Sequence, residues 1–194
     1  MLSKVDPNQL TTVRLLLTPI ALLLLLQASA VSLAICLFVM IVIELTDFFD
    51  GYVARKYNKG SDWGKVYDPM CDAVYHLTMY LGLIGFFASK LFVVAVAIIF
   101  FREIFVAYLR VFCATNGLVL AAMRIGKFKA NMQMISVFSC VIWLFLADVY
   151  GDCRLTGAWF WFSVISVALA LIFTIISLGY YCSFVKKNFL GKNA

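Results

Sequence analysis

Long apolar segments recur along almost the whole chain, and they constrain its fold more than any other feature. A helix needs roughly 20 apolar residues to cross about 30 Å of bilayer hydrocarbon. Charged residues make up 13% of the chain, about half the share that a soluble domain carries. The sequence therefore predicts an all-α integral membrane protein with six transmembrane helices, in a single domain covering residues 1–194. The predicted spans are residues 12–30, 33–55, 66–88, 91–114, 129–150 and 157–183.

The N-terminal region offers two interpretations. A cleaved signal peptide is disfavoured, because Arg14 interrupts its apolar stretch and Pro19 follows. We therefore predict a retained first span. Residues 2–11, which precede it, are predicted to form a short interfacial segment lying under the bilayer.

The basic residues predict a membrane topology rather than a nucleic-acid partner. The formal net charge is +6, but the positive residues form short clusters between apolar segments. Only Lys90 and Arg154 fall on one side of the predicted membrane. The other side carries Lys4, Arg14, Arg55, Lys56, Lys59, Lys65, Arg124, Lys127, Lys129, Lys186, Lys187 and Lys192. The positive-inside rule then places both termini in the cytoplasm.

The six cysteines show no metal-binding or disulfide spacing. They stand at positions 36, 71, 113, 140, 153 and 182, without a CxxC pair. We predict that they are small core residues.

Two groups of aspartates lie where the second predicted span ends and the third begins. On a helix, Asp47, Asp50, Gly51 and Ala54 share one face, because their spacing is i, i+3, i+4, i+7. After a short link, three further residues repeat at i, i+4, i+8: Gly64, Asp68 and Asp72. A short link makes the two helices antiparallel neighbours, so four carboxylates can converge.

Carboxylates at this depth need a functional explanation. Each costs roughly 2.5 to 3.5 kcal/mol at the centre of a membrane helix, and like charges repel one another unless a cation lies between them. Oxygen ligands without His or Cys suit Mg²⁺ or Mn²⁺. Two such ions can clamp a pyrophosphate during an in-line displacement. Small residues at 51, 54 and 64 would let a nucleotide approach the helices, and Arg55 could pair with phosphate oxygens, although helix packing also explains small residues.

The complete pattern resembles the signature of the CDP-alcohol phosphotransferase family. It reads Asp47-x2-Asp50-Gly51-x2-Ala54-Arg55-x8-Gly64-x3-Asp68-x3-Asp72, within residues 47–72. The resemblance implies a six-span fold, usually dimeric, that opens to the cytoplasm and binds a CDP-linked lipid beside two Mg²⁺ or Mn²⁺ ions.

The resemblance also implies roles for individual residues. Asp47, Asp50, Asp68 and Asp72 would bind the metal pair, and Gly51, Ala54, Arg55 and Gly64 would contact the CDP-lipid. Asp72 would in addition take the proton from the acceptor hydroxyl, and CMP would leave. A carboxylate within reach of both a metal and an alcohol can act as a general base.

Three further segments resemble phosphatidylglycerophosphate synthases of this family. They are NQLTTVRLLLTP, which matches at Asn8, Thr11, Arg14 and Pro19, then REIFVAYLR at 102–110 and GKFKANMQM at 126–134. These imply CDP-diacylglycerol and glycerol 3-phosphate as substrates, in the inner membrane of a bacterium. The acceptor phosphate needs basic groups, for which the candidates are Arg102, Arg110, Lys127 and Lys129.

Several alternatives remain open at this stage. Arg102 could instead pair with Glu103 or Glu44, and the two lysines could be topology charges. His76 could be part of the site, or it could be a packing residue. Ala73 and Ala130 stand where relatives usually carry lysine and threonine. The acceptor could therefore be inositol phosphate, inositol, serine or phosphatidylglycerol instead of glycerol 3-phosphate. A small cation transporter is a further alternative, disfavoured because the outer halves of the spans have few polar residues.

Overall fold

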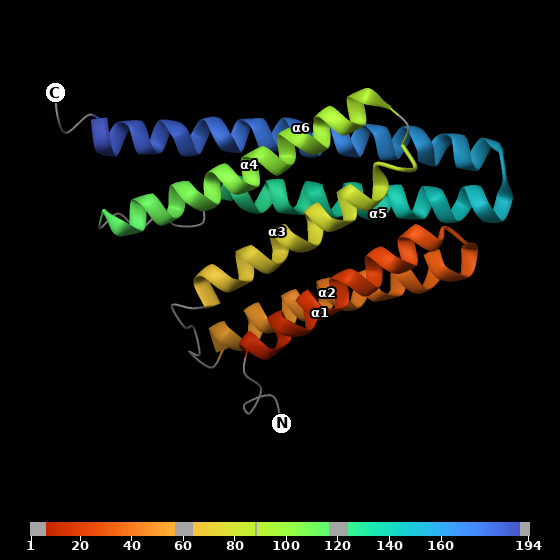
Figure 1. The fold of residues 1–194 in the computed structure, drawn as a ribbon, viewed down its shortest axis with the longest axis horizontal. Helices are drawn as coiled ribbons and strands as arrows, with labels where there is room; N and C mark the ends of the chain where they lie inside the picture. Colours follow the sequence, from red (N-terminus) through yellow and green to blue (C-terminus); the bar gives the residue numbers. More distant parts are fainter. Residues whose placement is uncertain (1–6, 57–63, 88, 117–123, 191–194) are drawn as a thin grey trace.

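The described residues form six long α-helices, which confirms the predicted all-α class (Figure 1). The computed structural model describes residues 7–56, 64–87, 89–116 and 124–190. The elements are α1 (Pro7–Gln27), α2 (Ala30–Lys56), α3 (Gly64–Leu83), α4 (Lys90–Thr115), α5 (Arg124–Tyr150), α6 (Arg154–Val185) and the π-helix η2 (Lys186–Leu190).

Four of the described helices are long and apolar enough to cross a bilayer. These stretches are Ala30–Phe49, Lys90–Thr115, Ile125–Tyr150 and Arg154–Asn188, and Thr11–Gln27 is a shorter apolar helix. α3 does not reach this threshold within its described residues, because it carries Asp68, Asp72 and His76 along 20 residues. A multi-helix membrane protein is therefore confirmed, whereas the count of six spans stays a prediction.

The first helix begins earlier than predicted. Residues 7–11 continue into α1, because Pro7 occupies the first helical position, where a missing N–H costs nothing. They do not form a segment separate from the first helix. Residues 2–6 of the predicted interfacial segment lie outside the described part.

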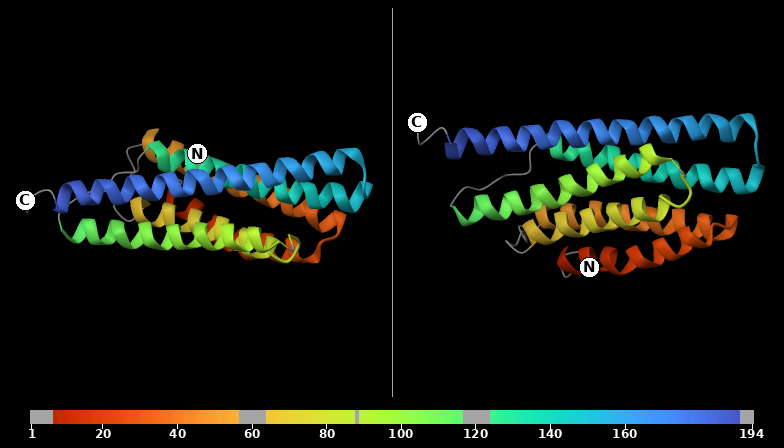
Figure 2. Two further views of the ribbon diagram at one scale, coloured as in Figure 1. Left: turned by 90° about the horizontal axis from the view of Figure 1, so that it is seen from above. Right: turned by 45° about the horizontal axis from the view of Figure 1, so that its top comes forward.

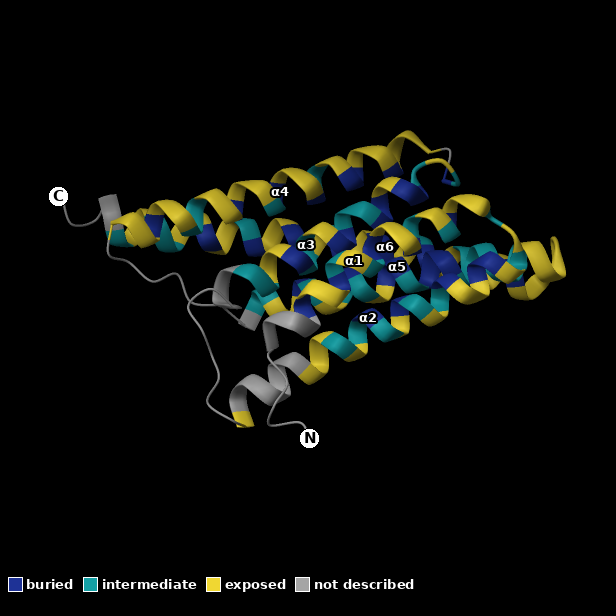
Figure 3. Cartoon of the chain, turned by 60° about the horizontal axis from the view of Figure 1, so that its bottom comes forward, coloured by how far each residue is buried: buried dark blue, intermediate teal, exposed yellow. Residues whose placement is uncertain are grey.

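Many large apolar residues are exposed, and Figure 3 shows exposed positions along the outer faces of the described helices. Leu23, Phe38 and Leu91 are 63%, 66% and 81% exposed. Small polar residues lie inside instead, for example Ser136 and Ser163. Exposed apolar faces around small interior residues are the arrangement expected in lipid.

The helices run roughly along one common axis (Figures 1 and 2). α1 packs on α2 and α3, α5 packs on α6 and α2, and α4 packs on α6. The C-terminal ends of α2, α4 and α6 gather at one end of the bundle with the N-terminal ends of α1, α3 and α5. This end carries the aspartates described above, and the opposite end carries the tight links, including Gly151 at φ 62°.

The cysteines follow the prediction in part. Cys36, Cys71, Cys113 and Cys140 are buried core residues, and all six cysteines are free. Cys153 and Cys182 are exposed and do not belong to the core.

Candidate active site

The first helix holds two of the predicted metal-binding aspartates from adjacent turns. Thr11 Oγ1 donates a hydrogen bond of 2.8 Å to Asp68 Oδ1 on α3, and Arg14 pairs with Asp47 on α2. Thr11 and Arg14 are three residues apart, so their side chains are neighbours on one face of α1. α1 therefore brings Asp47 and Asp68 close together.

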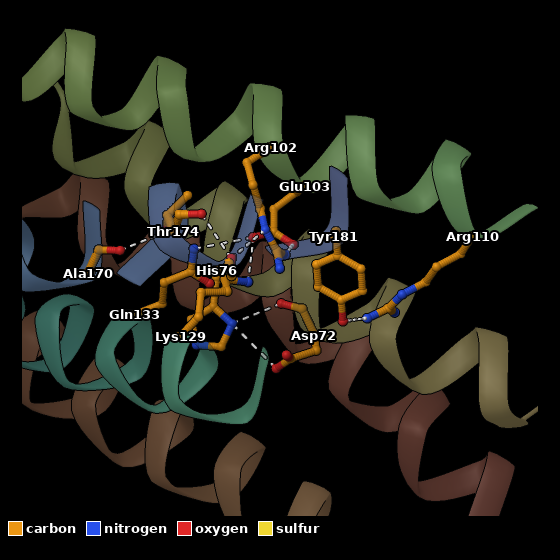
Figure 4. A network of polar contacts seen from close by, with 11 residues as sticks. Asp72, His76, Arg102, Glu103, Arg110, Lys129, Gln133, Ala170, Thr174 and Tyr181 are labelled. Carbon is orange, nitrogen blue, oxygen red and sulfur yellow. Dashed lines mark hydrogen bonds and ion pairs between the residues drawn. The ribbon is translucent and has the colours of Figure 1, made fainter. Parts of the chain in front are cut away.

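Asp72 follows Asp68 by one turn of α3. Its carboxylate is 35% exposed, and the charge of Arg14 acts on it. His76 contacts Asp72 twice: Nδ1 lies 2.9 Å from the Asp72 carbonyl oxygen and 3.4 Å from Oδ1 (Figure 4). Asp47 and Asp68 are thus held by neighbouring side chains of α1, and Asp72 is held by His76 one turn after Asp68.

The remaining signature residues lie where only the helical backbone is described. α2 is helical without a break from Asp47 through Lys56, as the predicted spacing requires, and α3 begins at Gly64. The side chains outside the described part are those of Asp50, Ala54 and Arg55. Their predicted roles, and those of Gly51 and Gly64, stay predictions.

The donor atoms at this end of the bundle fit a hard divalent cation. Asp47, Asp68 and Asp72 offer carboxylate oxygens, the ligands that Mg²⁺ and Mn²⁺ prefer. Among the side chains that the structure describes, no group of three acidic, His or Cys residues is close enough to hold a metal ion. Asp50, the fourth predicted ligand, is not among them. In this arrangement the Arg14 guanidinium supplies the positive charge beside Asp47.

A second polar cluster lies inside the bundle, where α4, α5 and α6 meet (Figure 4). Glu103 of α4 is its centre. It pairs with Lys129 of α5, accepts a hydrogen bond of 3.1 Å from Arg102 Nη1, and accepts one of 3.3 Å from Gln133 Nε2. Arg102, Lys129 and Gln133 are each at most 5% exposed. Two buried cations against one carboxylate leave an excess of positive charge.

Tyr181 of α6 lies beside two arginines of α4. Arg110 Nη2 donates a hydrogen bond of 3.0 Å to the Tyr181 hydroxyl, and the guanidinium carbons of Arg102 and Arg110 lie 5.5 and 5.6 Å from its ring centre. Arg102 Nε donates to Ser177 Oγ at 3.1 Å. Within the described residues, Arg102 Nη2 and Arg110 Nε are buried without a hydrogen-bond partner. Guanidinium N–H groups of this kind bind phosphate oxygens well.

The structure brings three of the four predicted acceptor-binding residues together. Arg102, Arg110 and Lys129 line the interior cluster, and the charge of Lys129 acts on Asp72 across the gap between α5 and α3. Lys127 is instead exposed near the start of α5. The alternative pairing of Arg102 with Glu103 is also observed. A ligand that binds Arg102 would therefore bind it beside the Glu103 carboxylate.

Sequence reasoning missed several contacts of both clusters. Thr11 and Arg14 were matching positions of an N-terminal motif, but their aspartate partners could not be read from it. The pairing of Glu103 with Arg102 was one of the predicted alternatives, but the contacts of Glu103 with Lys129 and Gln133 were not predicted. Tyr181 carried no local signal, because it lies far along the chain in an apolar helix.

Comparison with known proteins identifies the family. The sequence model of the CDP-alcohol phosphatidyltransferase family matches residues 4–176. A CDP-diacylglycerol--glycerol-3-phosphate 3-phosphatidyltransferase of Mycoplasma genitalium is 32% identical over 78% of this chain and 64% of its own length. Relatives described in the same words are 32% identical in Cereibacter sphaeroides, over 79% of this chain and 70% of the relative, and 34% identical in Treponema pallidum, over 68% and 63%.

The chain thus spans slightly less than two thirds of the Mycoplasma genitalium and Treponema pallidum relatives. The family match nevertheless includes five of the six helices in full, and all residues of the two polar clusters except Ser177 and Tyr181. This coverage shows that the protein belongs to the CDP-alcohol phosphatidyltransferase family.

Proposed function

We propose that this protein transfers a phosphatidyl group from CDP-diacylglycerol to sn-glycerol 3-phosphate, giving phosphatidylglycerol phosphate and CMP. One observation carries the proposal: α1 holds aspartates of α2 and α3, and a buried cluster with two cations against one carboxylate lies beside Asp72 and His76 in the same bundle (Figure 4). A metal-bound pyrophosphate and a phosphorylated acceptor need these two opposite environments. The relatives are described as CDP-diacylglycerol--glycerol-3-phosphate 3-phosphatidyltransferases, which supports the same pair of substrates.

Two divalent cations, Mg²⁺ or Mn²⁺, are the proposed cofactors. Asp47, Asp50, Asp68 and Asp72 would hold them, and the family is known to use divalent metal ions. When bound, the ions neutralise the pyrophosphate and stabilise the attacking and leaving oxygens. The protein contributes the position of the carboxylates, which Thr11 and Arg14 fix from α1.

The cytidine diphosphate part of the donor is proposed to lie against α2 and α3. Gly51, Ala54 and Gly64 would allow close approach to the helix backbones, and Arg55 would pair with phosphate oxygens. The first turns of α3 and the last turns of α2 belong to the same end of the bundle, so one nucleotide can contact both.

Asp72 is proposed to accept the proton of the acceptor hydroxyl. That oxygen then attacks the phosphorus that carries diacylglycerol, and the bond from this phosphorus to the oxygen of CMP breaks. Asp72 is suited to the role because its carboxylate is partly exposed and pairs with His76, whereas the carboxylates of Asp47 and Asp68 are engaged by side chains of α1. A general base contributes roughly 10² to 10⁴ to the rate.

The acceptor phosphate is proposed to bind Arg102, Arg110 and Lys129. The unpartnered N–H groups of the two arginines supply donors, and the cluster keeps positive charge after pairing with Glu103. A dianionic phosphate compensates this charge, whereas serine or free inositol would not. Lys127 remains a candidate only as an exposed contact outside the buried cluster.

The helices are proposed to form six spans, with both termini and the site at the cytoplasmic face of a bacterial inner membrane. Described basic residues support this orientation, because Lys56, Lys127, Lys186 and Lys187 lie on helix ends at the aspartate end of the bundle. A homodimer, as the family resemblance implies, completes the proposal.

Release of CMP tests the proposed reaction. Purified protein is incubated with CDP-diacylglycerol and Mg²⁺ or Mn²⁺, and glycerol 3-phosphate is compared with inositol phosphate, inositol, serine and phosphatidylglycerol. We expect turnover with glycerol 3-phosphate alone, which would also show that Ala73 and Ala130 are tolerated. Turnover with another acceptor would keep the transfer chemistry and contradict the substrate, and no CMP with any acceptor would contradict the reaction.

A further inference from the structure

His76 is the single histidine of the chain, and its ring is held between the two polar clusters. It is 3% exposed, and its ring centre lies 4.9 Å from that of Tyr75 at an angle of 61°. Its ring contacts Asp72 and lies beside the buried cluster around Glu103 and Lys129 (Figure 4). His76 therefore lies at the boundary of two polar groups of side chains rather than in a wholly apolar neighbourhood.

The contacts of His76 identify which ring nitrogen carries a proton. Nδ1 lies 2.9 Å from the carbonyl oxygen of Asp72, and a carbonyl oxygen can only accept a hydrogen bond. Nδ1 is therefore a donor in either protonation state of the ring. The same N–H group faces Asp72 Oδ1 at 3.4 Å, so one donor serves both the backbone and the carboxylate of Asp72.

Simple packing does not account for this arrangement. Nε2 of His76 is buried and has no hydrogen-bond partner among the described residues. An unsatisfied buried nitrogen costs free energy that a phenylalanine ring of similar shape would not. The compensating contact in the structure is the one between Nδ1 and Asp72.

We propose that His76 is a positioning residue for Asp72, whose Nδ1–H group holds the Asp72 carboxylate in its working orientation. This inference rests on the proposed phosphatidyl transfer, in which Asp72 binds metal and takes the acceptor proton. Catalytic hydrogen bonds are often long in the free enzyme and shorten when substrates bind, which suits the 3.4 Å contact. Partners that orient metal ligands typically account for 10- to 100-fold in metal affinity or activity.

Three variants separate this role from packing. His76→Phe keeps a ring and removes both nitrogens, whereas His76→Asn keeps an amide N–H close to the position of Nδ1. Tyr75→Phe is the matched control, because it removes only the unpartnered hydroxyl of the adjacent buried ring. Each variant is compared with wild type for kcat, for KM of both substrates, for Mn²⁺ affinity by electron paramagnetic resonance, and for thermal unfolding.

We expect His76→Phe to lower kcat about tenfold or more and Mn²⁺ affinity about tenfold, with both KM values within about twofold. His76→Asn should retain most of both quantities, and Tyr75→Phe should match wild type. Wild-type kcat and Mn²⁺ affinity in His76→Phe, or equal losses in the Phe and Asn variants, would overturn the inference.

A failure of the proposed function is distinguishable from a failure of this inference. If wild-type protein releases no CMP, the proposed reaction is wrong, and Mn²⁺ affinity alone then decides the role of His76. If His76→Phe unfolds, the comparison of His76→Asn with Tyr75→Phe still decides it, because loss of Mn²⁺ affinity in the Asn variant contradicts the donor role.

Discussion

The two polar clusters of this bundle differ in the sign of their uncompensated charge. At one end of α1 and α3, the described residues include Asp47, Asp68 and Asp72, with Arg14 pairing with Asp47. Around Glu103 the opposite holds, since Arg102 and Lys129 share one carboxylate and Arg110 lies beside Tyr181. Both clusters place charge in an apolar bundle, where uncompensated charge is costly.

This difference indicates which ligand each cluster is built to receive. The acidic cluster becomes neutral by binding cations, and the basic cluster becomes neutral by binding a phosphate. His76 and Lys129 lie where the two clusters approach each other, so the ligands would meet near Asp72. The buried Ser139, Ser163 and Ser166 of α5 and α6 give a third environment without charge, which serves as a reference for both.

Removing metal should have the largest effect on the acidic cluster. We expect a chelator such as EDTA to abolish CMP release, because the carboxylates would then repel the pyrophosphate. Mg²⁺ or Mn²⁺ added in excess of the chelator should restore it, as measured by initial rates. Full activity after exhaustive chelation would refute the proposed role of the aspartates.

Asp72→Asn should reduce CMP release almost as much as removal of the metal. The amide has the same shape but neither takes the proton nor neutralises a cation, so we expect kcat to fall by about 10³ or more. Thermal unfolding of the variant should stay close to that of wild type, because the side chain is partly exposed. A variant that folds and retains more than a tenth of wild-type kcat would contradict the role of Asp72.

On the basic cluster, Lys129→Ala should raise KM for glycerol 3-phosphate about tenfold. A hydrogen bond to a charged group contributes about 1.5 to 3 kcal/mol, which exceeds one factor of ten. Lys127→Ala is the matched control, since Lys127 lies on the same helix but is exposed, and we expect less than a threefold change. Equal KM increases in the two variants would remove the distinction between the buried and the exposed lysine.

The helices that carry the aspartates, and the spacing of the aspartates, could be predicted from the sequence because both depend on residues close together in the chain. A continuous helix through Asp47 and an early turn of α3 at Asp68 follow from periodicity and from the short link. The contacts of Arg14 and Thr11 could not be predicted, because they depend on how α1 packs against two other helices. Tyr181 was missed for the same reason, since only the packing of α6 on α4 brings it to Arg110.

The uncharged reference region should show the smallest effect. Ser166 of α6 lies 2.7 Å from the hydroxyl of Ser139 on α5, inside the bundle. Ser166→Ala should lower the free energy of unfolding by about 0.6 kcal/mol, the typical value of one such bond between membrane helices. We expect kcat and both KM values to remain within twofold of wild type, and a larger loss of activity would mean that the comparison omits a functional region.

The central claim is tested most directly by measuring the dependence of one variant from each cluster on both ligands. Asp68→Asn and Arg110→Gln are assayed by CMP release, varying Mn²⁺ and glycerol 3-phosphate separately. The account predicts that Asp68→Asn raises the activation constant for Mn²⁺ about tenfold or more and leaves KM for glycerol 3-phosphate within twofold, whereas Arg110→Gln does the reverse. If both variants change both constants to the same extent, the two clusters do not serve separate ligands and the account is wrong.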